Sequence, residues 1–114
     1  MSTEWTSDTP GAGAYAASKA AIRSFGRTWA AELAGRSIRV NTLIPGATET
    51  PGLAGLAPDA VAAASMFKGM AASIPLGRLA HPDEIANAAL FLASAQSSFM
   101  TGAEIFVDGG ERQL

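Results

Sequence analysis

The feature that most constrains the fold of this chain is a helix-forming run that begins at Tyr15 and continues to Leu33. Bulky apolar residues recur along it at three- and four-residue spacing, and alanine is abundant between them. This pattern predicts a helix with one buried stripe, made of Ile22, Phe25, Trp29 and Leu33. We expect the helix to end near Ala34, with Gly35 in the left-handed conformation that commonly follows a helix.

Tyr15 and Lys19 stand four residues apart at the start of this helix, so their side chains lie one above the other. An ammonium group within a few ångströms stabilises a phenolate, and a phenol tuned in this way can give or take a proton near neutral pH. The same spacing also occurs on many solvated helix faces. Spacing alone therefore leaves both a catalytic and a surface role open.

The rest of the chain alternates between strand and helix patterns. The β-branched residues Ile38, Val40 and Thr42 predict a strand over 37–43, which the following Pro-Gly pair stops. The region 51–74 is small and apolar, and we expect a helix there with Pro58 and Asp59 in its first turn. A short strand is predicted over 104–107, closed by a turn.

A further helix is predicted to begin at Pro82, with Asp83 and Glu84 in its first turn, where the helix dipole favours negative charge. Its buried stripe is predicted to contain Ile85, Ala88, Ala89 and Leu92. His81 precedes this helix and is expected to be a cap or surface residue. Asp108 could bind a ligand, but before two glycines it is more often a turn former.

Helices separate the two predicted strands, which indicates a crossover connection and parallel pairing in an α/β fold. Ligands in such sheets lie beyond the carboxyl ends of the strands, so a cofactor is expected beside the loop after the first strand. A two-stranded sheet is marginal in water, and the first strand would present an open edge. We therefore expect association through this edge or through the helix that begins at Tyr15.

Composition excludes several classes of function. The chain has 8 Lys and Arg against 10 Asp and Glu, so it lacks the basic surplus that nucleic-acid binding needs. No apolar run is long enough for a bilayer, and the first residues do not predict a signal peptide. The absence of cysteine excludes disulfides and thiolate metal sites and fits a reducing cytoplasm. With a single histidine, no metal site is expected.

Several short strings follow one another in a recognisable order: Tyr15-Ala16-Ala17-Ser18-Lys19, Ile38-Arg39-Val40-Asn41, Pro45-Gly46-Ala47-Thr48-Glu49-Thr50-Pro51, Pro75-Leu76-Gly77-Arg78, Pro82-Asp83-Glu84-Ile85-Ala86, Thr101-Gly102 and Val107-Asp108-Gly109-Gly110. Together they resemble the C-terminal half of a short-chain dehydrogenase/reductase, an NAD(P)-dependent oxidoreductase with a doubly wound, Rossmann-type parallel sheet. The resemblance covers essentially the whole chain from Ser2. The Gly-rich TGxxxGxG turn and the Asn-Ala-Gly stretch of that family do not precede Tyr15.

This resemblance implies a single partial domain over 1–114, with 1–14 as a loop and 51–74 as a lid over the substrate. It also implies hydride transfer between the nicotinamide of NAD or NADP and a small alcohol or carbonyl substrate. Tyr15 would exchange a proton with the substrate oxygen, and Lys19 would tune Tyr15 and hold the ribose hydroxyls. Ser2, 13 positions before Tyr15, would orient the substrate oxygen, although its match could also be accidental.

The same resemblance places the cofactor against the loop after the first strand, at Pro45 and Gly46. Thr48 would offer its backbone amide, and Thr50 its hydroxyl, to the nicotinamide carboxamide. The ordinary alternative for Thr50 is a helix cap or turn residue before Pro51.

Two other questions stay open at this level. The apolar lid region indicates a mostly nonpolar substrate, but Met and Phe at helical spacing are more often packing residues. The tail 111–114 resembles tails that reach subunit partners, and we expect a homo-oligomer, either a dimer or a tetramer. A complete enzyme would be active and this chain alone inert; the alternative is a non-catalytic, helix-rich module for self-association or partner binding.

Overall fold

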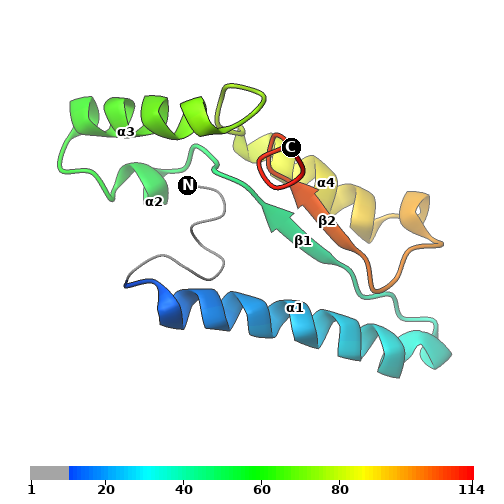
Figure 1. The fold of residues 1–114 in the computed structure, drawn as a ribbon. Coiled ribbons are helices and arrows are strands. Elements are labelled where there is room, and N and C mark those ends of the chain that lie inside the picture. The colour runs from blue at the N-terminus through cyan, green and yellow to red at the C-terminus, as the bar shows by residue number, and fades with distance from the viewer. Residues whose placement is uncertain (1–10) are drawn as a thin grey trace.

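The structure is a computed structural model, and it describes residues 11–114. Ser2 and most of the predicted loop over 1–14 lie outside the described residues. Figure 1 shows the elements in chain order. They are α1 (Gly13–Leu33), the 3-10 turn η2 (Ala34–Arg36), β1 (Thr42–Pro45), α2 (Pro51–Ala54), α3 (Ala60–Ser73), α4 (Pro82–Ala93), the 3-10 turn η3 (Ala95–Ser97) and β2 (Glu104–Val107).

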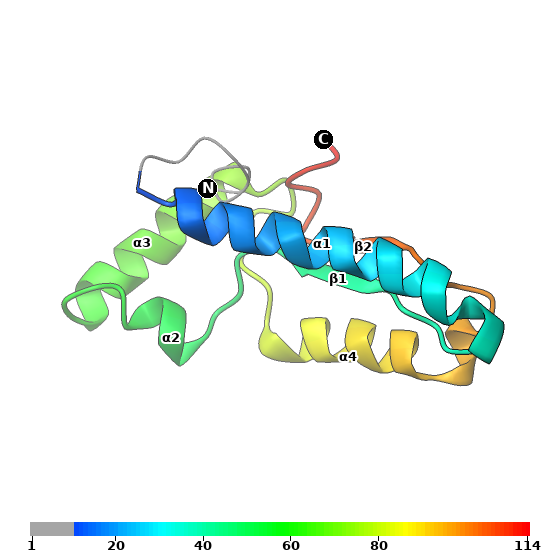
Figure 2. The same ribbon diagram turned by 90° about the horizontal axis from the view of Figure 1, so that it is seen from below.

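The two strands form a parallel sheet between two helices. Thr42 pairs with Glu104, and the register continues to Pro45 opposite Val107. Two roughly perpendicular views place α1 along one face of the pair and α4 along the other, with α2 and α3 beyond one end (Figures 1 and 2). The prediction of an α/β fold with parallel pairing is confirmed, as is the strand over 104–107.

Helix α1 buries a different face from the one predicted. Ile22, Phe25 and Trp29 are each about half exposed, and the buried residues are Ala16, Gly26 and Ala30. The small residues face the strands: a Cβ on Gly26 would lie 2.4 Å from the Thr42 hydroxyl oxygen. The helix therefore packs by close backbone approach, and its bulky side is left half exposed. It also begins at Gly13, inside the predicted loop.

The connection from α1 to β1 is longer than the sequence pattern predicted. Ser37, with φ 58°, takes the left-handed conformation expected for Gly35, because η2 extends the helical winding by three residues. The strand then runs from Thr42 to Pro45 and not over 37–43. Ile38 and Val40 precede the ladder because β2 begins only at Glu104.

Arg39 and Asn41 attach this connection to residues 92–103, between the end of α4 and the start of β2. The Arg39 guanidinium donates to the carbonyl oxygens of Leu92, Ser94, Ser97 and Met100 at 2.8–3.1 Å, and to the Ser97 hydroxyl at 3.0 Å. These carbonyls include groups that the C-terminal end of a helix leaves without partners. Asn41 donates to the Met100 carbonyl and accepts from the Ala103 N–H, both at 3.1 Å.

The main hydrophobic core lies where α3 meets the loop after β1. Met70, Ile74 and Leu79 are buried there, and further residues pack against them, namely Ala47, Leu53, Met66, Phe67 and Ala71. Asp59 caps α3 by accepting the Ala62 N–H at 2.8 Å, so it precedes the first turn in which it was expected. The packing role of this region is therefore observed; a lid role stays a prediction.

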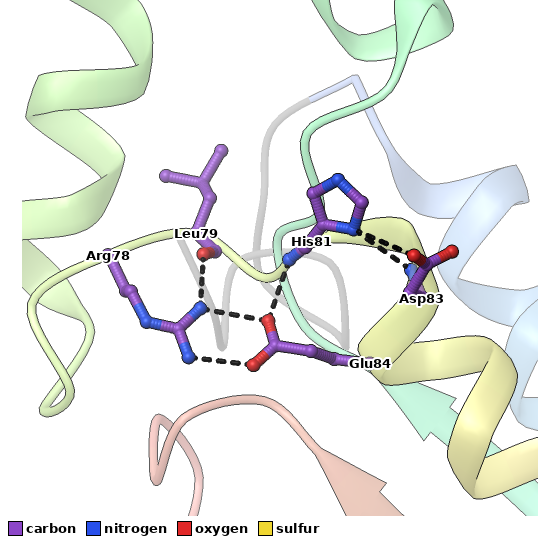
Figure 3. A network of polar contacts seen from close by, with 5 residues as sticks. All are labelled: Arg78, Leu79, His81, Asp83 and Glu84. Atoms are coloured by element: carbon purple, nitrogen blue, oxygen red, sulfur yellow. Dashed lines mark hydrogen bonds and ion pairs between the residues drawn. The ribbon is translucent and has the colours of Figure 1, made fainter.

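A polar network sets the start of α4, as Figure 3 shows. The Glu84 carboxylate accepts two hydrogen bonds from Arg78, at 2.7 and 2.8 Å, and one from the His81 N–H at 2.7 Å. The His81 ring in turn accepts the Asp83 N–H at 3.3 Å. The predicted Pro82 start, acidic first turn and capping His81 are confirmed. The predicted stripe is only partly covered and Ala89 is exposed, because α4 meets a narrow sheet.

Candidate functional site

A cavity of about 620 Å³ runs along β1 and past its carboxyl end, between that strand, the first half of α1 and the segment around α2. Its walls carry most of the residues that the sequence singled out. They include Tyr15 and Lys19 from α1, Pro45, Gly46, Thr48 and Thr50 from the loop after β1, and Leu53, Leu56 and Met70 from the apolar region. This is the end of a parallel strand at which α/β sheets bind ligands.

Tyr15 and Lys19 come together on the first two turns of α1. The Lys19 ammonium lies over the Tyr15 ring, 5.4 Å from its centroid, which is within the range of a cation–π contact. Tyr15 is half exposed and lines the cavity. The predicted pairing of these side chains is therefore present, while their catalytic role stays a prediction.

Hydrogen bonds hold the loop after β1 along the cavity wall. The Gly46 N–H donates to the Val107 carbonyl at 2.9 Å, and the Thr48 hydroxyl donates to the Gly46 carbonyl at 3.0 Å. The Thr50 hydroxyl oxygen accepts the Leu53 N–H at 3.1 Å and so caps α2. The capping role considered for Thr50 is therefore real, and its O–H proton is not used by that bond.

Gly46 is required by packing as well as by any ligand. A Cβ at this position would lie 2.6 Å from the Asp108 Cα and 2.7 Å from its Cβ. Asp108 accepts the Gly110 N–H at 3.0 Å, which confirms its turn-forming role, and its second carboxylate oxygen is buried without a hydrogen-bond partner among the described residues. The close contact between Gly46 and Asp108 therefore requires a residue without a side chain where the carboxyl ends of β1 and β2 meet.

Sequence reasoning missed three charged residues that also line the cavity: Arg23, Glu111 and Arg112. Arg23 follows Lys19 by four residues, so helical periodicity could have placed it on the same wall. Glu111 and Arg112 had no such signal, because only the turn at the end of β2 brings them there. Ser2, the third predicted catalytic residue, lies outside the described residues.

Other kinds of site find no support in residues 11–114. No cluster of three or more side chains there has the composition of a metal site. Within the same residues, no helix combines the length and hydropathy needed to cross a bilayer.

The parallel strand pair between helices, with a Tyr–Lys pair at the strand end, defines an α/β protein of the Rossmann type. Comparison with known proteins identifies the family more closely. Residues 2–111 match the family described as enoyl-(acyl carrier protein) reductase. The chain belongs to the short-chain dehydrogenase/reductase family.

Individual relatives agree with this assignment. The chain is similar to 3-oxoacyl-[acyl-carrier-protein] reductase FabG from Thermotoga maritima, with 48% identity over 89% of this chain and 39% of the relative. It is similar to 2,5-dichloro-2,5-cyclohexadiene-1,4-diol dehydrogenase LinX from Sphingobium indicum, with 41% identity over 90% of this chain and 38% of the relative.

Among solved structures, a short chain dehydrogenase family protein from Francisella tularensis superposes with a TM-score of 0.88 at 35% identity. That match covers 99% of this chain and 49% of the other. The chain therefore spans between about a third and a half of the length of the proteins it matches.

Proposed function

We propose that this chain is the catalytic C-terminal part of an NAD(P)-dependent oxidoreductase that interconverts an alcohol and a carbonyl compound. The observation that carries the proposal is the position of Tyr15 and Lys19, which lie together on the wall of the cavity at the carboxyl end of β1. Family membership supports the class of reaction. The substrates named for the relatives differ widely, so they do not select one for this chain.

The residues present fit a nicotinamide and its ribose in chemical type. The cavity has the volume of a typical small-molecule site. Its polar lining includes a phenol, an ammonium and threonine side chains, together with the charged side chains of Arg23, Glu111 and Arg112. Lys19 would hold the ribose hydroxyls, while Thr48 and Thr50 would face the carboxamide. When bound, the nicotinamide supplies or accepts the hydride.

Proton transfer is the chemical step that the chain itself provides. In reduction, the Tyr15 hydroxyl gives its proton to the oxygen that becomes the alcohol; in oxidation, the Tyr15 phenolate takes the proton from the alcohol. Lys19 would stand beside this transfer, with its ammonium over the Tyr15 ring. Ser2 would orient the substrate oxygen, and Leu53, Leu56 and Met70 would contact a nonpolar part of the substrate.

The chain alone is expected to be inactive. A Rossmann fold binds the pyrophosphate of its cofactor at a Gly-rich turn, and no such turn precedes Tyr15 in this sequence. We infer that the chain functions within a longer protein. The in-frame sequence upstream of Met1 tests this directly, because it should encode a Gly-rich turn and an Asn-Ala-Gly stretch.

Cofactor binding separates the proposal from its alternative. NADH and NADPH are titrated into the 114-residue chain and into the longer protein, with tryptophan fluorescence as the readout. We expect saturable binding and turnover only in the longer protein. A longer protein that binds neither nucleotide would contradict the oxidoreductase assignment.

A non-catalytic role in self-association is the second candidate, and the half-exposed apolar side of α1 favours it. The two functions are compatible, because Phe25 and Trp29 on that side of α1 do not line the cavity that holds Tyr15 and Lys19. Self-association without nucleotide binding by the longer protein would favour the second candidate alone.

A further inference from the structure

Two guanidinium groups flank one aromatic ring beside the cavity. The Arg23 Cζ lies 5.9 Å and the Arg112 Cζ 5.6 Å from the centroid of the Phe106 ring. Arg23 comes from α1, one helical turn beyond Lys19, and Arg112 comes from the turn after β2. Both line the same cavity as Tyr15. Two chain segments that are distant in sequence therefore each place a guanidinium near the same ring.

These two arginines have unequal partners within the chain. Arg23 donates to the Glu104 carboxylate at 2.5 Å, yet its Nε–H is buried with no acceptor among the described residues. Arg27 shares the same carboxylate at 2.8 Å. Arg112 has no carboxylate within ion-pair distance in the part of the chain that the structure describes.

The charge that lines the cavity is consequently biased. Its cationic side chains are Lys19, Arg23 and Arg112, and Glu111 is its single acidic one. Clefts lined by one sign of charge concentrate ligands of the opposite sign. A guanidinium also presents its N–H groups in a planar fork that matches a carboxylate or a phosphate.

We propose that Arg112 binds a carboxylate or phosphate group of the substrate. The inference rests on the proposed function and deepens it: the substrate is an anionic alcohol or carbonyl compound, and Arg112 determines this specificity. An anion beside Arg112 would lie against a guanidinium that no carboxylate of residues 11–114 already pairs with. Lys19 is assigned to the phenol and the ribose, so Arg112 is the cation available for the substrate.

A pair of substrates that differ only in charge tests the proposal in the longer protein. The pair is 3-hydroxybutyrate and its methyl ester, each oxidised with the nicotinamide nucleotide that the protein binds. We expect Arg112→Gln to lower kcat/KM for the acid by about ten- to a hundredfold, as loss of a charge-assisted hydrogen bond does. We expect a change of less than about twofold for the ester. Equal effects on both substrates, or no effect on either, would overturn the proposal.

Two further variants control for charge and for folding. Arg112→Lys keeps the positive charge but loses the planar arrangement of N–H donors of the guanidinium. We expect this variant to retain part of the preference for the acid. Arg36→Gln makes the same change of charge as Arg112→Gln, but on the exposed 3-10 turn after α1, away from the cavity walls. We expect its kcat/KM to match the parent for both substrates. An equal loss in Arg36→Gln would show a general charge effect and contradict a site at Arg112.

A readout that needs no turnover separates this inference from the proposed reaction. Arginine Nε–Hε resonances of the longer protein are followed by NMR during titration with 3-hydroxybutyrate, with inorganic phosphate and with the methyl ester. We expect saturable shifts at Arg112 with an anion, none with the ester, and none at Arg36. The anion that saturates identifies the group recognised. Saturable anion binding without turnover would support the anion site and contradict the oxidoreductase assignment. Shifts no larger than those of Arg36 would overturn the site.

Discussion

The Lys19 ammonium lies 5.4 Å from the centroid of the Tyr15 ring, one helical turn away along α1 and on the wall of the cavity. The contact requires only that the helix form, because residues four apart share a face. The tertiary structure then sets this turn of α1 beside the end of β1. The Tyr15 ring is thereby both close to a positive charge and on the wall of the cavity.

The first prediction concerns the proton that Tyr15 exchanges. Tyr15→Phe removes the hydroxyl and keeps the ring under Lys19, so we expect kcat of the longer protein to fall by about 10²–10⁴-fold. The far-ultraviolet circular dichroism and the melting temperature should stay unchanged, because the side chain is half exposed. A fully active Tyr15→Phe variant would remove this residue from the mechanism.

The second prediction concerns the close contact between Gly46 and Asp108 at the two strand ends. Gly46→Ala places a Cβ 2.6 Å from the backbone Cα of Asp108, which no rotamer change can relieve. We expect a loss of about 1–3 kcal/mol in the free energy of unfolding, as overpacking typically costs. Urea denaturation followed by circular dichroism measures it.

Gly69→Ala is the matched control for that experiment. Gly69 lies inside α3, and an added Cβ meets nothing within 4 Å. We expect it to raise the free energy of unfolding by about 0.5–1 kcal/mol, because alanine is the better helix former. Similar losses in both variants would contradict the close approach of Gly46 to Asp108.

The third prediction concerns the hydrogen bonds that Arg39 makes at the end of α4. Arg39→Leu removes donors to four carbonyl oxygens in the stretch from Leu92 to Met100. Hydrogen bonds from charged groups contribute about 1.5–3 kcal/mol, so we expect a loss of at least about 2 kcal/mol in the free energy of unfolding. Amide hydrogen exchange should speed up between 94 and 103. An unchanged exchange rate there would show that η3 holds without Arg39.

The fourth prediction follows from the pKa of Glu84, which the hydrogen bonds from Arg78 and His81 lower from its ordinary 4.5 to about 2. Because the folded pKa is the lower one, the ionised carboxylate stabilises the fold above pH 4.5. This stabilisation is lost as the pH falls from 4.5 through about 2. The loss should be modest, since both side chains are exposed to solvent.

Glu84→Gln tests that pH dependence. Its melting temperature should fall less steeply than that of the parent between pH 4.5 and 2, and NMR should find the Glu84 carboxylate of the parent titrating near pH 2. Parallel melting curves for the two proteins, with a carboxylate titrating at its ordinary pKa, would show that the network of Figure 3 does not persist in solution.

Local signals were sufficient to predict much of this fold and part of the site. Pro82, Asp83 and Glu84 act within one helical turn, so the start of α4 could be predicted from their order. Parallel pairing followed from two strands separated by helices. The loop residues Thr48 and Thr50 were found because they follow a strand end directly. In each case the interaction that matters spans only a few residues.

The features that sequence reasoning missed depend on contacts between distant segments. Ile22 and Trp29 have the periodicity of a core, but what covers them is set by the width of the sheet and not by α1. The partners of Arg39 lie more than fifty residues away. Arg112 reaches the cavity only because β2 pairs with β1 and turns back. None of these long-range contacts produces a periodic pattern or a short residue spacing in the sequence.

The last prediction concerns the bulky side of α1. Ile22, Phe25 and Trp29 are 49–53% exposed, and the Phe25 and Trp29 rings stack with their centroids 5.2 Å apart. Contiguous exposed apolar side chains of this kind mark interaction surfaces, and tryptophan is frequent among their energetically dominant residues. We therefore expect the chain to self-associate through this side of α1.

Analytical ultracentrifugation can separate this surface from the other candidate, the open edge of β1. Trp29→Ser should raise the dissociation constant of the oligomer by at least about thirtyfold, because the loss of a dominant tryptophan costs about 2 kcal/mol or more. Val61→Ser, on the exposed side of α3, removes an apolar side chain that is 81% exposed, and should leave association unchanged. Association that survives Trp29→Ser would point to strand pairing at the edge of β1, where backbone groups and not side chains make the contacts. A compact monomer would contradict association through either surface. The exposed apolar side chains of α1 and the unpaired backbone groups of β1 are both stabilised only when another chain covers them.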